Sequence, residues 1–217
     1  MVKYRYIFFD LDGTLTDSAE GILKSIAFAL EKFGIVSSDV SGLNRFLGPP
    51  LKEAFMDFCG FSESDALKAV EYYRERFRNV GIFENRVYDG IYTLLEKLNA
   101  AGLTLIMATS KPEIFAKRIT DHFDLTKYFA LITGATFDGK ISTKTDVLEY
   151  AFSQLGNIDK KEAVMIGDRN HDIGGAHNMG IDSIGVLYGY GSLEELENAG
   201  ATFIAESPEE VEKILLK

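Results

Sequence analysis

The sequence predicts an α/β fold, in which a parallel sheet flanked by helices carries an inserted helical domain. Two observations support this fold class. Short apolar segments that suit buried strands alternate along the chain with amphipathic segments that suit helices. One long stretch, residues 17–83, contains helical patterns and no strand signal. The alternation is typical of a Rossmann-like parallel sheet, and the interruption after the first strand indicates an inserted domain rather than a single crossover helix.

The predicted strands are short, and most are almost wholly apolar, as expected for strands that helices cover on both faces. They are residues 4–10, 103–108, 131–133, 163–166, 182–186 and 202–204. Helix signals lie between them. Pro112 suits the start of one helix, and Ser207 with Pro208 suits the start of the last.

The predicted domain bounds follow from this division. Residues 1–16 and 84–217 would form a discontinuous Rossmann-like core, and residues 17–83 would form a helical cap. Asp17 and Glu20 have the spacing of a capping box, and Ser62 suits the start of a second cap helix. The buried stripes expected for these two helices are Ile22, Ile26, Leu30 and Phe33, and Leu67, Val70, Tyr73 and Phe77.

The composition argues against several classes of protein. A formal net charge of −10 opposes binding to DNA or RNA, because such binding depends on a basic surface. No apolar run approaches the roughly 18 residues that cross a bilayer, so we expect no membrane insertion. Cys59 is the only cysteine, which excludes an internal disulfide, and the first residues lack the pattern of a secretory signal. We therefore expect a cytoplasmic protein, either a monomer or a weak homodimer.

Four aspartates are predicted to gather at one edge of the sheet. The first strand ends in Asp10 and Asp12, and the strand at residues 163–166 is followed by Asp168 and Asp172. Ligands bind outside the carboxyl ends of parallel strands. A single aspartate at such a place usually serves a turn or a helix cap, but two pairs in one place repel each other unless a cation lies between them. The pattern therefore predicts a divalent metal, and Mg²⁺ fits best because it binds few carboxylates and leaves positions for phosphate oxygens.

A longer set of motifs contains these aspartates. Residues 10–16 read Asp-Leu-Asp-Gly-Thr-Leu-Thr, Thr109 follows a later strand, Lys144 precedes a helix, and residues 167–172 read Gly-Asp-Arg-Asn-His-Asp. In this order, and with a helical insert after the first, they resemble the four motifs of the haloacid dehalogenase-like hydrolase superfamily over essentially the whole chain. The insert is similar to the small helical cap found in phosphoglycolate phosphatases, 5′-nucleotidases and β-phosphoglucomutases. The branch that the chain resembles most is the phosphoglycolate phosphatase-like one.

The resemblance implies a magnesium-dependent phosphatase that acts on small phosphorylated metabolites. Asp10 would be the nucleophile that forms an aspartyl-phosphate. Asp12 would be the general acid and base, and its backbone carbonyl would also bind the metal. Asp168 would be a further metal ligand, and Asp172 would hold a metal-bound water or the ammonium group of Lys144.

The resemblance also implies which groups hold the substrate. Thr109 would donate its hydroxyl to the phosphate, Ser110 would donate its backbone N–H, and Gly13 of the first motif would also lie at the substrate. Lys144 would be the catalytic lysine. It lies later than the Lys-Pro pair of many relatives, so Lys140 stays an alternative.

Two cations of the cap, Arg45 and Lys52, are candidates for binding an anionic group of the substrate. It is an equally good interpretation that both are solvated surface residues around a helix-to-helix turn.

The alternatives differ in the fate of the phosphoryl group. A 5′-nucleotidase would pass it to water, and a β-phosphoglucomutase-like phosphotransferase would pass it to a sugar. A receiver-like signalling module would keep the phosphoryl group on Asp10, and the phosphorylated aspartate would change the binding of a partner. Dehalogenation is disfavoured, because that reaction has no leaving alkoxide for Asp12 to protonate.

Overall fold

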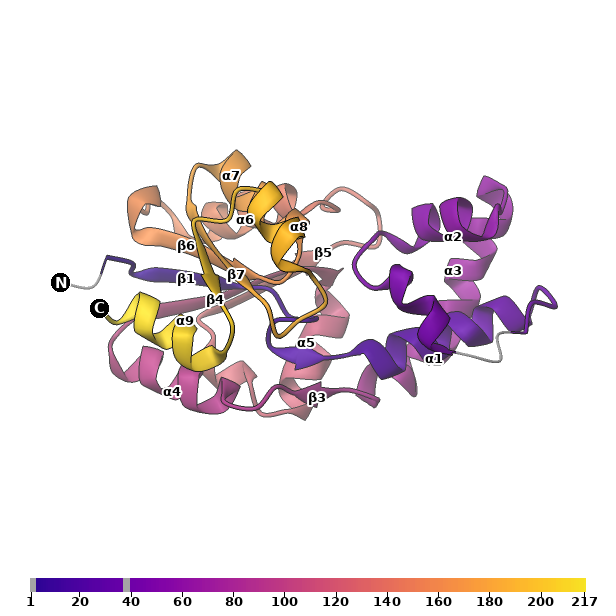
Figure 1. Ribbon diagram of the computed structural model, residues 1–217, viewed down its shortest axis with the longest axis horizontal. Coiled ribbons are helices and arrows are strands. Elements are labelled where there is room, and N and C mark those ends of the chain that lie inside the picture. The colour runs from indigo at the N-terminus through magenta and orange to yellow at the C-terminus, as the bar shows by residue number, and fades with distance from the viewer. Residues whose placement is uncertain (1–2, 37–39) are drawn as a thin grey trace. The chain divides into compact units, whose positions relative to one another are not determined.

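The computed structural model describes residues 3–36 and 40–217. The chain divides into two compact units (Figure 1). The first comprises the residues up to Asp17 together with Val87–Lys217, and the second is Ser18–Arg86. The first unit holds a parallel sheet, and the second is built from helices. The interpretation of the helical unit as a cap domain with the bounds 17–83 stays a prediction.

The sheet of the first unit has six strands within the described residues, in the order β5-β4-β1-β6-β7-β8, and every neighbouring pair is parallel. The strands are β1 (Tyr6–Phe9), β4 (Thr104–Pro112), β5 (Leu131–Ala135), β6 (Ala163–Gly167), β7 (Asp182–Val186) and β8 (Phe203–Ala205). The predicted fold class is confirmed. Because β1 pairs with both β4 and β6, the carboxyl ends of these three strands lie side by side.

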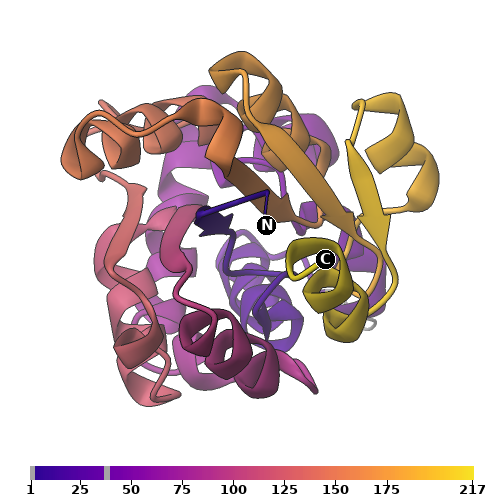
Figure 2. The ribbon, with the colours of Figure 1, turned by 90° about the vertical axis from the view of Figure 1, so that its left-hand side faces the viewer.

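Helices cover both faces of the sheet (Figure 2). Helices α6 and α7 lie on one face, and α4 and α9 lie on the other. The helices of this unit are α4 (Ile91–Ala100), α5 (Glu113–His122), α6 (Lys144–Leu155), α7 (Asn170–Met179), α8 (Leu193–Asn198) and α9 (Pro208–Leu215), with short 3₁₀ helices η3 (Thr126–Tyr128) and η4 (Lys160–Glu162). Among the residues that the structure describes, no helix combines the length and the hydrophobicity that crossing a bilayer would demand.

One apolar cluster of the first unit lies between the sheet and helices α6 and α7. Phe8, Ile106 and Met165, from three neighbouring strands, have no exposed surface and cluster with Leu148 of α6. The ring of Phe8 also stacks on Phe152 at 5.0 Å between centroids. Each fully buried side chain of this size stabilises the fold by about 1.5–3 kcal/mol. The strands that carry the site are therefore supported by a buried apolar cluster.

The second unit contains α1 (Ala19–Glu31), η1 (Val40–Phe46), α2 (Leu51–Cys59), α3 (Glu63–Phe77) and η2 (Gly81–Phe83). Both α1 and α2 pack on α3. Aromatic rings pack against one another in this unit. The ring centroid of Phe61 lies 4.6 Å from that of Phe33 and 6.0 Å from that of Phe55. The unit therefore has an apolar core of its own.

The predicted capping of α1 by Asp17 is wrong. Ser18 occupies the N-cap position, and Asp17 ends the short strand β2 (Thr16–Asp17), which pairs with β3 (Arg86–Val87). The carboxylate of Asp17 accepts a hydrogen bond from the hydroxyl of Tyr190 at 3.2 Å. That longer-range partner draws Asp17 away from the helix, which its spacing to Glu20 could not indicate.

The start of α3 is as predicted, and Val70, Tyr73 and Phe77 of its predicted stripe are buried. The hydroxyl of Ser62 accepts the backbone N–H of Asp65 at 3.1 Å, which confirms the N-cap. Leu67, predicted to be buried, is 52% exposed. Ala66 and Ala69 are also buried on this helix.

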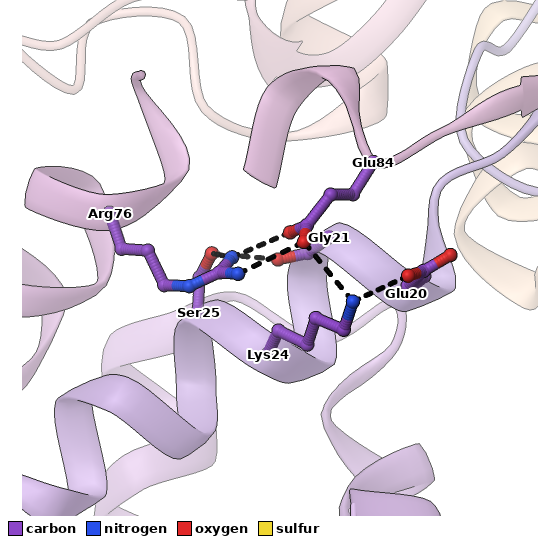
Figure 3. A network of polar contacts seen from close by, with 6 residues as sticks. All are labelled: Glu20, Gly21, Lys24, Ser25, Arg76 and Glu84. Atoms are coloured by element: carbon purple, nitrogen blue, oxygen red, sulfur yellow. Dashed lines mark hydrogen bonds and ion pairs between the residues drawn. The ribbon is translucent and has the colours of Figure 1, made fainter. Parts of the chain in front are cut away.

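A polar network ties the two ends of the helical unit together (Figure 3). Arg76 of α3 donates two hydrogen bonds to the carboxylate of Glu84, at 2.7 and 3.0 Å, and a third to the hydroxyl of Ser25 at 3.2 Å. Lys24 reaches the same carboxylate at 3.1 Å, and the backbone N–H of Gly21 donates to the carbonyl of Glu84 at 3.0 Å. The first helix of the unit, α1, is thus bound to Arg76 and Glu84 near the end of the unit.

Candidate active site

The carboxyl ends of three neighbouring strands bring the predicted site residues together. Asp10 follows β1, Thr109 lies near the end of β4, and Asp168 follows β6. The backbone N–H of Asp10 donates to the carbonyl of Ile166 at 2.9 Å, which continues the pairing of β1 with β6 past the end of β1. Residues far apart in the sequence therefore meet at one edge of the sheet.

Three of the four predicted aspartates form a tight cluster. Asp10, Asp168 and Asp172 each offer a carboxylate oxygen, and these oxygens all lie within 4.8 Å of one another. Asp168 is 0% exposed and Asp172 is 1% exposed. Asp172 lies in the first turn of α7, where its carboxylate also accepts the backbone N–H of Arg169 at 3.0 Å.

Lys144 places a positive charge inside this cluster. Its Nζ lies 2.8 Å from Oδ1 of Asp10 and 2.8 Å from Oδ1 of Asp172, and it donates to the carbonyl of Ala108 at 2.8 Å. Burial lowers the pKa of the Lys144 ammonium, but the two carboxylates outweigh burial, and the pKa lies above its ordinary value. The lysine therefore stays charged although its side chain is only 3% exposed.

The start of α6 fixes the position of Lys144. Thr143 forms a capping box with Asp146: its hydroxyl accepts the N–H of Asp146 at 3.1 Å, and the carboxylate of Asp146 accepts the N–H of Thr143 at 2.9 Å. Lys144 is the first residue of the helix, and its side chain passes close to Gly175 of α7. A Cβ atom on Gly175 would lie 2.6 Å from Cγ of Lys144, so the glycine leaves the space that the lysine occupies.

The buried carboxylates are poorly compensated in the protein alone. Burial raises the pKa of Asp168 well above its ordinary value, and repulsion from Asp172 and Asp10 raises it further. Burial also raises the pKa of Asp172, to about 6, and repulsion from Asp10 adds to this, although Lys144 acts in the opposite direction. A further cation near Asp168 would relieve this repulsion.

Hydrogen bonds and close packing hold Asp168 in place. The hydroxyl of Thr14 donates to its Oδ1 at 3.1 Å, and the backbone N–H of Tyr190 donates to its Oδ2 at 2.8 Å. Gly13 has a φ of +83°, and a Cβ atom there would lie 2.2 Å from Oδ2 of Asp168. A Cβ atom on Gly189 would lie 2.4 Å from the Cβ of Asp168. Both glycines are therefore required for the backbone to approach the carboxylate.

Lys111 is a site residue that sequence reasoning missed. Its Nζ donates to Oδ2 of Asp12 at 2.6 Å, and its side chain is only 6% exposed. The sequence prediction ended the strand at Ala108. In the structure β4 continues to Pro112 and carries Lys111 to the site. The position of Lys111, two residues after the motif residue Thr109 and directly before a helix, was the signal that could have identified it.

Thr109 and Ser110 lie at the same edge of the sheet. Thr109 is 1% exposed, and its hydroxyl oxygen accepts the backbone N–H of Lys111 at 3.2 Å. Ser110 is exposed and precedes α5 by three residues. Their predicted contacts with phosphate stay predictions.

The other predicted cations have partners elsewhere. Lys140 is 83% exposed and pairs with Asp138, whereas Lys144 lies in the carboxylate cluster. Arg45 donates to the carbonyl of Phe58 at 3.3 Å and lies over its ring. Lys52 pairs with a glutamate at the start of α3 at 3.1 Å. The predicted substrate contacts of Arg45 and Lys52 stay predictions.

The donor set of the cluster fits Mg²⁺. Asp10, Asp168 and Asp172 provide hard oxygen donors, which Mg²⁺ prefers, and Asp168 and Asp172 have raised pKa values because burial and mutual repulsion disfavour their ionised forms. Lys144 neutralises part of the charge beside Asp10 and Asp172.

The chain belongs to the haloacid dehalogenase-like hydrolase family, whose model matches residues 7–186. The predicted family is confirmed. A crystal structure described as that of a predicted phosphatase from Clostridium acetobutylicum is 53% identical, has a TM-score of 0.93 and covers 98% of each chain. The protein is a phosphatase, that is, a phosphoric monoester hydrolase.

Curated relatives have different names. A 5′-nucleotidase of Pseudomonas aeruginosa is 47% identical, over 90% of this chain and 88% of its own length. The tyrosine-protein kinase PtkA of Mycobacterium tuberculosis is 39% identical, over 93% of this chain and 68% of its own length. A phosphoglycolate phosphatase of Agrobacterium fabrum is 32% identical, over 87% of this chain and 83% of its own length.

Proposed function

We propose that this phosphatase hydrolyses small phosphate monoesters in two steps through an aspartyl-phosphate on Asp10, with Mg²⁺ as cofactor. One observation carries the assignment of roles. The side chains of Asp10 and Asp12 are 13% and 22% exposed, whereas Asp168 and Asp172 are almost completely buried. A substrate can reach the first pair, and the second pair is suited to holding charge in place.

In the first step, a carboxylate oxygen of Asp10 attacks phosphorus. The bond between phosphorus and the leaving oxygen breaks, and Asp12 in its acid form gives that oxygen a proton, so that an alcohol leaves. In the second step, a water molecule attacks the phosphorus of the aspartyl-phosphate while Asp12 accepts a proton from the water. Inorganic phosphate leaves, and both aspartates return to their starting forms.

Asp10, Asp168 and the backbone carbonyl of Asp12 would hold the metal, and Asp172 would support it. When bound, Mg²⁺ supplies positive charge that neutralises phosphate oxygens. Lys144 supports the same task, because its buried ammonium lies 2.8 Å from the nucleophile. Thr109 would donate a hydrogen bond to the phosphate from the neighbouring strand.

We propose nucleoside 5′-monophosphates as the first substrate class to test, ahead of phosphoglycolate. The relative named 5′-nucleotidase is 47% identical, and the relative named phosphoglycolate phosphatase is 32% identical. Phosphoryl transfer to tyrosine is a second candidate function, because the relative named PtkA is 39% identical. It would use the same nucleophile with a hydroxyl in place of water.

Asp10→Asn tests the proposed mechanism. The variant should lose hydrolysis of p-nitrophenyl phosphate by about 10³-fold or more, because the amide keeps the shape of the side chain but cannot act as the nucleophile. The matched control is Asp89→Asn, which changes an exposed aspartate in the same way and should retain activity. Circular dichroism checks that both variants are folded. Retained activity in folded Asp10→Asn would refute the assignment.

A kinetic screen separates the substrate classes. The values of kcat/KM for nucleoside monophosphates, phosphoglycolate and sugar phosphates should rank the nucleotides first. A parallel reaction with ATP and a tyrosine peptide tests the second candidate function: phosphorylated peptide would favour it, and its absence beside rapid ester hydrolysis would favour the phosphatase alone. Transfer of phosphate from a substrate to a sugar would instead favour a mutase.

We also propose a cytoplasmic location and a monomer or weak homodimer. The single cysteine, Cys59, is a free thiol and is compatible with a reducing compartment. Sedimentation of the purified protein over a range of concentrations tests the assembly.

A further inference from the structure

Lys111 is a second buried lysine at this edge of the sheet, distinct from Lys144. Burying an ammonium group is costly unless a partner compensates its charge. Lys144 is paired with Asp10 and Asp172, whereas Lys111 is paired with Asp12, at 2.6 Å. The two lysines therefore serve different carboxylates.

The backbone fixes where Lys111 lies. The register between β4 and β5 shifts between Thr109 and Pro112, so Lys111 lies within an irregular segment of the strand. Its N–H donates to the hydroxyl of Thr109 at 3.2 Å. A Cβ atom on Gly134 of β5 would lie 2.5 Å from the carbonyl oxygen of Lys111, so the neighbouring strand can approach only because this residue is glycine.

The carboxylate of Asp12 has few other contacts. Its Oδ2 accepts the hydrogen bond from Lys111, and its buried Oδ1 accepts none from the part of the chain that the structure describes. Lys111 is thus the group that anchors this carboxylate among the described residues. We infer that Lys111 is a positioning residue for proton transfer: it holds the side chain of Asp12 in the orientation from which Asp12 protonates the leaving group. This inference rests on the proposed function of Asp12.

Removal of Lys111 should affect esters with different leaving groups to different extents. An alkoxide is a poor leaving group and needs a proton from Asp12 as the bond to phosphorus breaks. The anion of 2,4-dinitrophenol is stable in water and leaves without a proton. If Lys111 acts through Asp12, its removal must slow the hydrolysis of alkyl esters more than that of the dinitrophenyl ester.

The test compares Lys111→Met with the wild-type protein on glycerol 2-phosphate and on 2,4-dinitrophenyl phosphate, with Mg²⁺ in excess. The value of kcat/KM reports the first step for both esters. We expect the loss for the alkyl ester to exceed the loss for the dinitrophenyl ester by about tenfold or more, since general acid catalysis contributes about 10²–10⁴-fold. Equal losses on both esters would overturn the inference and leave Lys111 a structural or substrate-binding residue.

A double-mutant cycle provides the second measurement. In the Asp12→Asn background, Lys111→Met should cost little further activity toward the alkyl ester, because its target is already lost. Additive losses would contradict the inference. Lys111→Arg retains a charged donor and should recover part of the selectivity. If the Met variant does not fold, Lys111→Gln takes its place, and a Gln variant with the same selectivity as Lys111→Arg would overturn the inference.

The outcomes distinguish the two proposals. Wild-type protein that hydrolyses neither ester would overturn the proposed function and the inference with it. Wild-type protein that hydrolyses both, with an inactive Asp10→Asn variant and an unchanged leaving-group selectivity in Lys111→Met, would leave the proposed function standing and overturn the inference alone.

Discussion

At the scale of single residues, the aspartates of the site lie in two different environments. Asp10 and Asp12 are partly exposed, and each lies beside a buried lysine. Asp168 and Asp172 are buried, and their pKa values are raised by burial and by repulsion between carboxylates. Burial therefore divides the acidic residues into a partly exposed pair, which we propose meets the substrate, and a buried pair, which we propose holds charge.

The raised pKa values predict how stability depends on pH. An acid whose pKa is higher in the folded protein binds its proton more tightly there than in the unfolded chain. Ionisation of Asp172 therefore destabilises the metal-free fold as the pH rises from its ordinary pKa of 3.8 to about 6. At the proposed metal site, Mg²⁺ would replace the proton as the compensating charge, so its stabilising effect should grow through the same window.

Melting temperatures with EDTA and with excess Mg²⁺ check this prediction. The increase caused by Mg²⁺ should be small near pH 5 and larger near pH 7, since the carboxylates must lose their protons to bind the ion. Asp172→Asn removes one titrating group and should weaken the pH dependence. An equal increase at both pH values would show that these carboxylates do not bind the metal.

At the scale of elements, the segment between β7 and α8 determines the position of Asp168. The N–H of Tyr190 binds its carboxylate, and Gly189 packs against both Asp168 and the loop after β1. A Cβ atom on Gly189 would lie 2.2 Å from the carbonyl oxygen of Gly13. This loop therefore orients a proposed metal ligand.

Gly189→Ala tests the role of this segment. The added methyl group must push the loop away from Asp168, so we expect a loss of about 1–3 kcal/mol in the free energy of unfolding. The affinity for Mg²⁺, measured by calorimetry, should fall by about 10–100-fold, as is typical when the groups that orient a metal ligand are lost.

The matched control is Gly174→Ala in α7. No atom lies within 4 Å of the position of the new Cβ, and alanine favours a helix, so this variant should gain up to about 1 kcal/mol in stability. It should bind Mg²⁺ as the wild-type protein does. Unchanged Mg²⁺ affinity in a destabilised Gly189→Ala variant would assign the loop a structural role only.

The strands of the large sheet could be predicted from the sequence, but the full length of β4 could not. Apolar runs predicted every strand of the large sheet, because burial on both faces demands apolar residues. The extension of β4 to Pro112 could not be predicted, since Lys111 is held there by its pairing with Asp12 and not by a local pattern. The same reason explains Asp17, whose partner Tyr190 is distant in the sequence.

At the scale of the whole molecule, a net charge of −10 opposes the approach of an anionic ester. Fold class, family and the gathering of Asp10, Asp168 and Lys144 could be predicted from the sequence, because they depend on strand order and motif spacing. The substrate could not, because no motif of the sequence identifies the groups that meet the part of the ester beyond phosphorus. Arg45 and Lys52 illustrate this: both have partners within that unit.

The net charge predicts opposite salt effects on substrate and metal. With Mg²⁺ saturating, kcat/KM for an anionic ester should rise about twofold or more as salt is added, because the Debye length is about 10 Å at 0.1 M and repulsion is screened. The affinity for Mg²⁺ should fall over the same range, since screening weakens its attraction. A fall in kcat/KM at saturating Mg²⁺ would indicate that the local cations, and not the net charge, govern the encounter.

The most direct test of the central claim, that the side chain of Asp10 accepts the phosphoryl group, is chemical trapping during turnover. The enzyme is quenched in acid while it hydrolyses an ester, treated with borohydride, which reduces an aspartyl-phosphate to homoserine, and mapped by mass spectrometry. We expect homoserine at position 10 and at no other aspartate. Homoserine elsewhere, or rapid turnover with none trapped at position 10, would contradict the account.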